Sequence, residues 1–364
     1  MRRLRTLLLY ASNADNATFS YQRGWPRHFV THPAFVCTAI NVAASSIPER
    51  LRLEWAVRAF SGDLIVILHS VFSNVQLLAP RLADHLRRRP APKAFFIGNE
   101  YKLMPEKMTF CERIGVSLLV SQSLSREVHD LYRRRLGCLV TGIPNTGLDP
   151  AVFFPGIDPA ARPIDLGYRA ADAPLYLGHR ERAEIAEFFT ANAARYGLRV
   201  DISLHHRDRL DERGWAEFLN RCKGQLGSEA GGDYFDLEDR TRDAVNQYCN
   251  AHPGATFEDV KSRFFPPTHP TIPLRILSGR HVEAAGTKTA QVLIAGHYDG
   301  LFIADEHYIP LERNFSNADE AMRKFADISF RNAVADRAYE FTRAELTYDR
   351  LVDRFRDAVT PLVH

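Results

Sequence analysis

The sequence predicts an α/β protein of two domains, each built on a parallel β-sheet covered by helices. Three observations predict this fold: the length, short apolar runs that alternate with amphipathic stretches, and a proline-rich break near the middle. The chain has 364 residues, more than the roughly 250–300 that one hydrophobic core usually serves. Its hydrophobic content of 45% and charged content of 25% are ordinary for a globular protein.

Apolar runs and helix-like stretches alternate in the first half of the chain. Helices are expected over Val75–Arg88 and Ser125–Arg135. The expected strands lie in LRTLLLYA (4–11), DLIVILHS (63–70), KAFFIG (93–98), VSLLVSQS (116–123) and GCLVTGIP (137–144). Runs of this length separated by helical stretches indicate βαβ units and therefore a parallel sheet.

A proline-rich segment separates this half from a second alternating half. Pro155, Pro159 and Pro163 fall close together and indicate a linker. After it, PLYLG (174–178) and LRVDISL (198–204) read as strands around a helix that ends before Gly197. Later strands are expected over 224–226, 291–295 and 308–311. Asn317, with Glu320 three residues on, has the spacing of a capping box, and a last helix with one apolar face spans 351–359.

Cysteine usage and hydropathy indicate a cytoplasmic protein. The five cysteines are scattered and include no C-x-x-C pair, which argues against a disulfide framework and a structural zinc site. The apolar run Leu7–Ala11 is too short for the core of a signal peptide. No stretch approaches the roughly 18 apolar residues of a membrane-spanning helix.

Charge is distributed unevenly along the chain. Residues 1–150 carry 20 Lys and Arg against 11 Asp and Glu, a net of +9, whereas residues 151–364 have a net of −6. A basic first half favours an anionic partner there: a phosphorylated acceptor, the inner face of an anionic membrane, or nucleic acid. Solvated arginines on helix faces would give the same count.

Two motifs in the second half carry candidate chemistry. In LGSEAGGDYFD (226–236), glycines after a strand let backbone N–H groups approach a ligand, and Glu229 supplies an acceptor. In RILSGRHVEAAGTKTAQVLIAG (275–296), Arg280 and the start of a short helix suit a phosphate, and Glu283 suits ribose hydroxyls. The alternatives are an ordinary glycine turn and a surface helix with a capping carboxylate.

These motifs, with HYDGLF (297–302) and DEHYIPLERNFSN (305–317), resemble the donor-binding domain of group-1, GT-B-type bacterial glycosyltransferases of surface-polysaccharide and glycan assembly. The resemblance is densest over residues 163–325. The first half matches at YQRGWP (21–26), DLIVILHS, FFIGNEY (95–101) and IPNTGLDPAVFFP (143–155). The last of these is similar to the segment that joins the two domains in such enzymes.

The resemblance implies a GT-B fold, in which two Rossmann-like domains face each other across a cleft. Residues 1–155 would form the acceptor-binding domain and 160–335 the nucleotide-sugar-binding domain. Residues 336–364 would return to pack on the N-terminal domain.

The family pattern also assigns roles to residues. Glu283 matches the carboxylate that binds the ribose, and Arg280 lies where the diphosphate and sugar would be. The catalytic candidates are His69, Glu100 and Arg280. The donor-binding candidates are Arg169, Gly178, Arg180, Gly227, Ser228, Glu229, Ser278, Gly279, His281 and Glu283. The sequence departs from the pattern at Arg275, eight positions before Glu283, where such enzymes usually carry a second Glu. The retaining or inverting outcome therefore stays open.

Missing motifs narrow the function further. No D-x-D, H-E-x-x-H or G-x-S-x-G occurs, so no metal or other cofactor is expected, and zinc proteases and α/β-hydrolases lack support. The expected activity is transfer of a sugar from a nucleotide-diphosphate donor to a glycan, lipid-linked or small-molecule acceptor. The alternatives are a GT-B-type epimerase or hydrolase, and a nucleic-acid-binding protein that uses the basic half. The arginine runs 87–89 and 133–135 lack interleaved aromatics, so nucleic acid is not expected.

Overall fold

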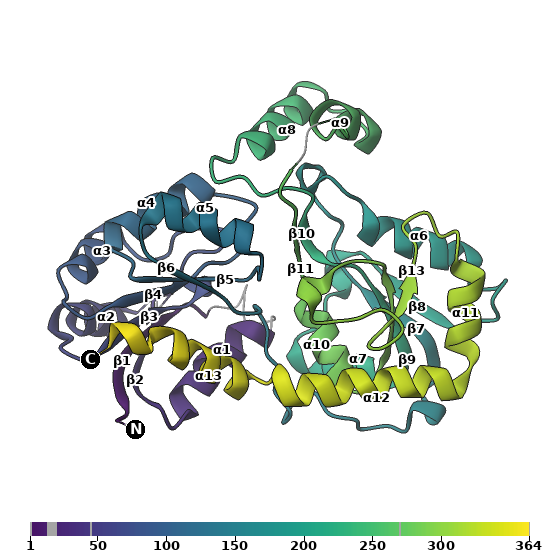
Figure 1. Ribbon diagram of the computed structural model, residues 1–364, viewed down its shortest axis with the longest axis horizontal. Coiled ribbons are helices and arrows are strands. Elements are labelled where there is room, and N and C mark those ends of the chain that lie inside the picture. The colour runs from purple at the N-terminus through teal and green to yellow at the C-terminus, as the bar shows by residue number, and fades with distance from the viewer. Residues whose placement is uncertain (1, 13–19, 44–45, 269–270, 364) are drawn as a thin grey trace.

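The computed structural model describes residues 2–12, 20–43, 46–268 and 271–363 and contains two α/β domains (Figure 1). The first domain holds a six-stranded sheet in the order β2-β1-β3-β4-β5-β6, with every neighbouring pair parallel. Its strands are β1 Leu4–Tyr10, β2 Phe35–Asn41, β3 Leu64–Ile67, β4 Lys93–Phe96, β5 Leu118–Ser121 and β6 Leu139–Gly142. Its helices are α1 Ser20–Thr31, α2 Ile47–Ala59, α3 Pro80–Arg87, α4 Met104–Ile114 and α5 Arg126–Leu136.

The central strands are buried from end to end because helices cover both faces of the sheet. Every residue of β3, β4 and β5 is buried, which explains why these strands read as continuous apolar runs. Strand β2 was not predicted: it is an edge strand with partly exposed residues. Helix α3 begins at Pro80 rather than Val75, as proline favours the first helical turn.

The second domain holds a five-stranded parallel sheet in the order β13-β12-β9-β7-β8. Its strands are β7 Ile164–Arg169, β8 Val200–Ser203, β9 Cys222–Gly227, β12 Ala290–Ile294 and β13 Ile309–Leu311, beside an antiparallel pair, β10 Ala230–Gly232 and β11 Leu274–Ile276. Its helices are α6 Glu181–Asn192, α7 Glu212–Arg221, α8 Arg240–Ala251, α9 Phe257–Phe264, α10 Gly279–Gly286 and α11 Ala318–Ala326.

Two local predictions in the second domain are wrong. PLYLG is not a strand: Leu175–Leu177 forms a 3-10 turn, and the first strand of the domain is β7. Pro174 and the left-handed Gly178 confine the apolar residues between them to a turn. Asn317 does precede α11, but its side chain bonds to the backbone of Glu312 and Pro310 instead of capping the helix.

The chain ends by crossing back to the first domain. Helix α12 (Ile328–Glu345) runs along the second domain, and α13 (Tyr348–Val359) lies against the first (Figure 1). Phe355 of α13 is buried, with its ring centroid 5.2 Å from those of both Phe29 and Phe96. The predicted return of the last helix is confirmed. Among the described helices, none is long and apolar enough to cross a membrane.

Candidate functional site

A cavity of about 270 Å³ lies between the two domains. Its lining from the second domain follows the carboxyl ends of β7, β8 and β9 of the parallel sheet, where open α/β sheets bind ligands, and the end of β11 beside them. The first domain contributes Asn99, Gln122 and Thr146, which follow β4, β5 and β6, and also Ser20 and Tyr21 of α1. The two sheets therefore present their carboxyl ends to one shared space.

Arginines give this cavity a positive character. Arg182 in the first turn of α6 and Arg280 in the first turn of α10 both line it. Within the residues that the structure describes, neither guanidinium makes a hydrogen bond or an ion pair. Burial lowers the pKa of Arg280, and the nearby charges of Arg182 and Arg209 lower it further. Because Arg182 and Arg280 have no anionic partner in the described residues, their charges favour the binding of an anionic ligand in this cavity.

Arg169 also lines the cavity, but its charge is already compensated. Its Nη2 donates to Asp201 Oδ1 at 2.6 Å, and its Nη1 donates to the carbonyls of Tyr168 and Asp201. The guanidinium carbon lies 4.4 Å from the centre of the Phe218 ring. Arg169 is therefore held as part of the wall, whereas Arg182 and Arg280 are not.

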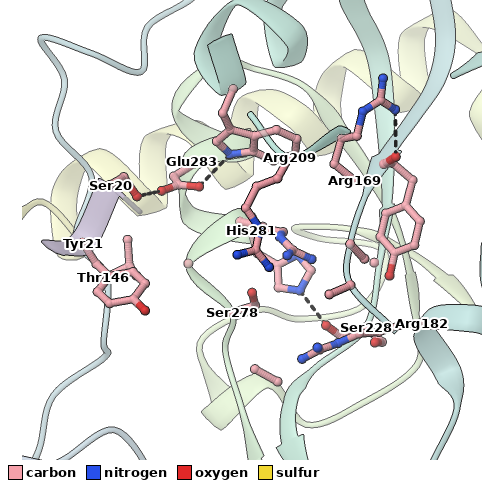
Figure 2. Close-up of a pocket in the computed structure, with 18 of the residues that line it drawn as sticks. Ser20, Tyr21, Thr146, Arg169, Arg182, Arg209, Ser228, Ser278, His281 and Glu283 are labelled. Carbon is pink, nitrogen blue, oxygen red and sulfur yellow. Dashed lines mark hydrogen bonds between the residues drawn. The ribbon is translucent and has the colours of Figure 1, made fainter. Parts of the chain in front are cut away.

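Glu283 lies on the wall where the domains meet. It accepts hydrogen bonds from Ser20 Oγ of the first domain and from Trp215 Nε1, the latter at 2.7 Å (Figure 2). Burial raises its pKa to about 7, although these two donors and Arg280 oppose the shift. A carboxyl group with this pKa changes charge near neutral pH and accepts hydrogen bonds from two directions.

The start of α10 is packed tightly against the first domain. A Cβ atom on Gly279 would lie 2.3 Å from Thr146 Oγ1, so glycine permits this approach. His281 of the same helix is buried, with its ring nitrogens 3.0 Å from the Ser228 carbonyl oxygen and 2.9 Å from Gln291 Oε1. Burial lowers the pKa of His281 to about 4, so the ring is neutral and joins α10 to the end of β9.

The structure brings most of the sequence-predicted donor residues together. The predicted residues that line the cavity are Arg169, Gly227, Ser228, Ser278, Gly279, Arg280, His281 and Glu283. Gly178 and Arg180 do not: they line a separate cavity of about 250 Å³, and Arg180 Nη2 lies 3.1 Å from Glu187 Oε1. Arg182, two residues further on, faces the interdomain cavity and was missed. The prediction took PLYLG as the strand that leads to the site, and therefore placed Gly178 and Arg180 at the end of a strand. Because PLYLG is a turn, these two residues do not follow a strand, and Arg182 faces the cavity instead.

Three predicted site residues, Glu229, Glu100 and His69, do not line the cavity but contact residues near it. Glu229 accepts the N–H of Tyr298 at 2.6 Å and does not line the cavity. Glu100 is buried and accepts from Ser121, Gln122 and Tyr132, so it fixes the end of β5. His69 is buried beneath Tyr21, with ring centroids 5.0 Å apart, and burial lowers its pKa to about 3.

Arg275, at the position of the family's second Glu, is also outside the cavity lining. Its guanidinium pairs with Glu181 at 2.9 Å and with Asp233. Asp299 of the HYDGLF segment also lies at the interface, although it was not among the predicted site residues. Its carboxylate accepts the N–H of Leu277 at 2.8 Å and that of Leu124, in the first domain, at 3.2 Å. In the described residues no group of three or more His, Cys, Asp or Glu could hold a metal ion.

Comparison with known proteins gives the fold a name. No family model matches the sequence, and no curated protein matches it either. Several solved structures match along nearly their whole length. HepE of Anabaena in complex with UDP is 10% identical, with a TM-score of 0.53 over 98% of this chain and 100% of that one. Sucrose-phosphate synthase from Thermosynechococcus elongatus is 11% identical, with a TM-score of 0.55 over 99% of each chain.

A third match is an alpha-glucosyltransferase in complex with UDP and a 13-mer DNA. It is 8% identical, with a TM-score of 0.58 over 98% of this chain and 100% of that one. Likeness at this level of identity establishes the fold. The chain has the GT-B fold of these glycosyltransferases, with two Rossmann-like domains, as the sequence resemblance predicted.

Proposed function

We propose that this protein transfers a sugar from a nucleotide-diphosphate sugar to an acceptor. The observation that carries the proposal is the interdomain cavity, where Arg182 and Arg280 remain unpaired beside the buried carboxyl group of Glu283. Two partly buried cations and one buried carboxyl group suit the diphosphate and the ribose of such a donor. The GT-B neighbours solved with UDP support the donor class.

The chemistry explains why the arginines would matter. Breaking the bond between the sugar and the diphosphate leaves negative charge on the leaving group. Arg182, Arg280 and the first amides of α10 are the groups available to stabilise that charge. Their backbone positions are set before any ligand binds, because α6 and α10 place both residues at the cavity wall. Glu283 would accept from the ribose, which changes little during the reaction.

The acceptor would enter from the first domain. Asn99, Gln122 and Tyr101 line that side and offer amide and hydroxyl groups to a polyhydroxylated partner. A glycan, a lipid-linked sugar or a small molecule fits this chemistry. We propose that transfer needs no divalent metal, because arginines stand where a metal would otherwise offset the diphosphate charge. Among the candidates, His69 and Glu100 would act through the lining residues Tyr21 and Gln122 that they contact.

Thermal-shift measurements with UDP, GDP, ADP, dTDP and their sugar conjugates test the donor site. A ligand at 100 times its Kd stabilises the fold by about 2.7 kcal/mol. Arg182→Ala is expected to abolish the shift, whereas Arg180→Ala, on the second cavity, is the matched control and keeps it. Absence of a shift with every nucleotide, or equal loss in both variants, would contradict the proposal. Sugar release without an added acceptor would indicate a hydrolase.

A further inference from the structure

Helix α2 carries a row of large apolar side chains that faces away from the protein. Ile47, Leu51 and Trp55 follow one another every four residues and are 73%, 62% and 70% exposed. Residues at this spacing share one face of a helix. The opposite face packs into the first domain through Leu53, Ala56 and Val57, which are buried. We call the three exposed residues the α2 stripe.

Arginines flank the α2 stripe. Arg50 and Arg52 are exposed on its two sides, and neither makes an ion pair within the part of the chain that the structure describes. Arg58 lies in line with the stripe and shares Glu54 with Arg81 of α3. The stripe therefore lies on a basic surface of a domain whose first 150 residues have a net charge of +9.

The position of α2 separates it from the proposed donor site. Figure 1 shows α2 at the end of the molecule opposite to the second domain. None of its residues lines the interdomain cavity. A partner bound to the α2 stripe would leave the cavity accessible.

The size of the stripe decides which partner fits. Three side chains of this kind expose on the order of 400 Å² of apolar surface, about half of what each partner buries in a stable protein interface. A second copy of this chain is therefore a poor match. A bilayer surface needs less area, because a few apolar side chains enter the headgroup region while cations pair with anionic lipids. Tryptophan is enriched at that depth.

We propose that α2 docks this protein on an anionic lipid bilayer. The side chains of Ile47, Leu51 and Trp55 enter the headgroup region, and Arg50 and Arg52 pair with lipid phosphates. This assigns a surface to the membrane contact that charge alone suggested. It does not depend on the proposed sugar transfer, since vesicle binding is measured without a nucleotide sugar.

Vesicle flotation tests the surface. Wild-type protein is expected to float with vesicles of phosphatidylcholine containing about 30% phosphatidylglycerol, and about tenfold less with phosphatidylcholine alone. The variant Ile47→Ser/Leu51→Ser/Trp55→Ser is expected to lose at least tenfold in binding to the anionic vesicles. Ile303→Ser/Ile328→Ser removes exposed apolar residues of the second domain, which are 50% and 60% exposed, and should bind like wild type.

Tryptophan fluorescence tests the orientation in the unmodified protein. Trp25 is buried and Trp215 bonds to Glu283, whereas Trp55 is exposed. Anionic vesicles should therefore shift the emission to the blue and protect it from a soluble quencher, and Trp55→Phe should remove the shift. Arg50→Glu/Arg52→Glu should weaken binding about tenfold, against Arg207→Glu/Arg213→Glu as control. Equal binding of the stripe variant and the wild type to vesicles would overturn the proposal. So would a wild type that binds no vesicles but self-associates, if the stripe variant no longer self-associates.

Discussion

Replacing Arg280 with alanine is expected to lower activity without lowering stability. Its guanidinium makes no hydrogen bond or ion pair in the described residues, and burial together with the Arg182 charge lowers its pKa. Removing it breaks no hydrogen bond or ion pair, and the repulsion from Arg182 that it relieves exceeds the attraction to Glu283 that it loses, so the free energy of unfolding should stay unchanged or rise by on the order of 1 kcal/mol. If Arg280 stabilises the leaving diphosphate, kcat should fall by about 10²-fold, the usual loss for one preorganised donor.

Arg275→Ala provides the contrast from the same segment. Arg275 is buried between Glu181 and Asp233 and does not line the cavity. Its removal leaves the carboxylate of Asp233 without a cation and that of Glu181 with Arg313 alone, and breaking a buried pair in this way costs about 3–5 kcal/mol. The variant should therefore lose stability, while the folded fraction keeps its kcat.

Urea unfolding and release of nucleoside diphosphate from the donor found by thermal shift measure the two effects separately. Arg280→Lys is expected to rescue kcat in part, because the charge is kept and the planar fork is lost. A folded Arg280→Ala variant with wild-type kcat and KM would refute the site assignment. So would a large loss of stability in that variant, because it would show that Arg280 supports the fold.

Four further predictions concern the candidate site. Glu283→Ala should mainly raise the KM for the donor. Glu283→Gln should stabilise the protein at pH 8 by roughly 3 kcal/mol at most. The reason is that a carboxyl group whose pKa is raised to about 7 contributes stability below pH 4.5, and this stability is lost as the pH rises toward 7. Equal free energies of unfolding for the variant and the wild type at pH 8 would contradict the prediction. Gly279→Ala places a Cβ atom against Thr146 and should reduce kcat/KM, and Thr146→Gly in the same chain should restore it; failure of this rescue would count against the packing argument. Activity should survive exhaustive chelation, and loss reversed by Mn²⁺ or Mg²⁺ would show that a metal is required.

The sequence predicts the sheets well where burial is complete. The continuous apolar runs of β3, β4 and β5 lie between helical stretches and therefore predict buried parallel strands. The structure confirms these three strands. Edge and turn positions are less predictable. Strand β2 is partly exposed, and PLYLG has the apolar composition of a strand but is bounded by Pro174 and Gly178. The apolar composition of a segment does not show whether it lies at the edge of a sheet or in a turn.

The candidate site is predictable where one contiguous motif forms the wall. Residues Ser278 to Glu283 lie together because β11 leads directly into α10. Arg182 was missed because its place depends on where β7 ends and α6 begins. Tyr21 and Thr146 line the cavity, and Asp299 joins the two domains; all three lie in segments that match the family, but a segment match does not show which of its residues meet the other domain.

The proposed site is incomplete in either domain alone. The second domain supplies Arg280 and Glu283, but Glu283 also accepts a hydrogen bond from Ser20 of the first domain. If the ribose binds Glu283 as proposed, its hydroxyl groups compete with Ser20 for the same carboxyl oxygen atoms. Donor binding would then exchange a contact between domains for a contact with ligand. Because Asp299 still holds Leu124 across the interface, the domains need not separate fully for this exchange. Donor binding and domain opening would then be linked through one carboxyl group.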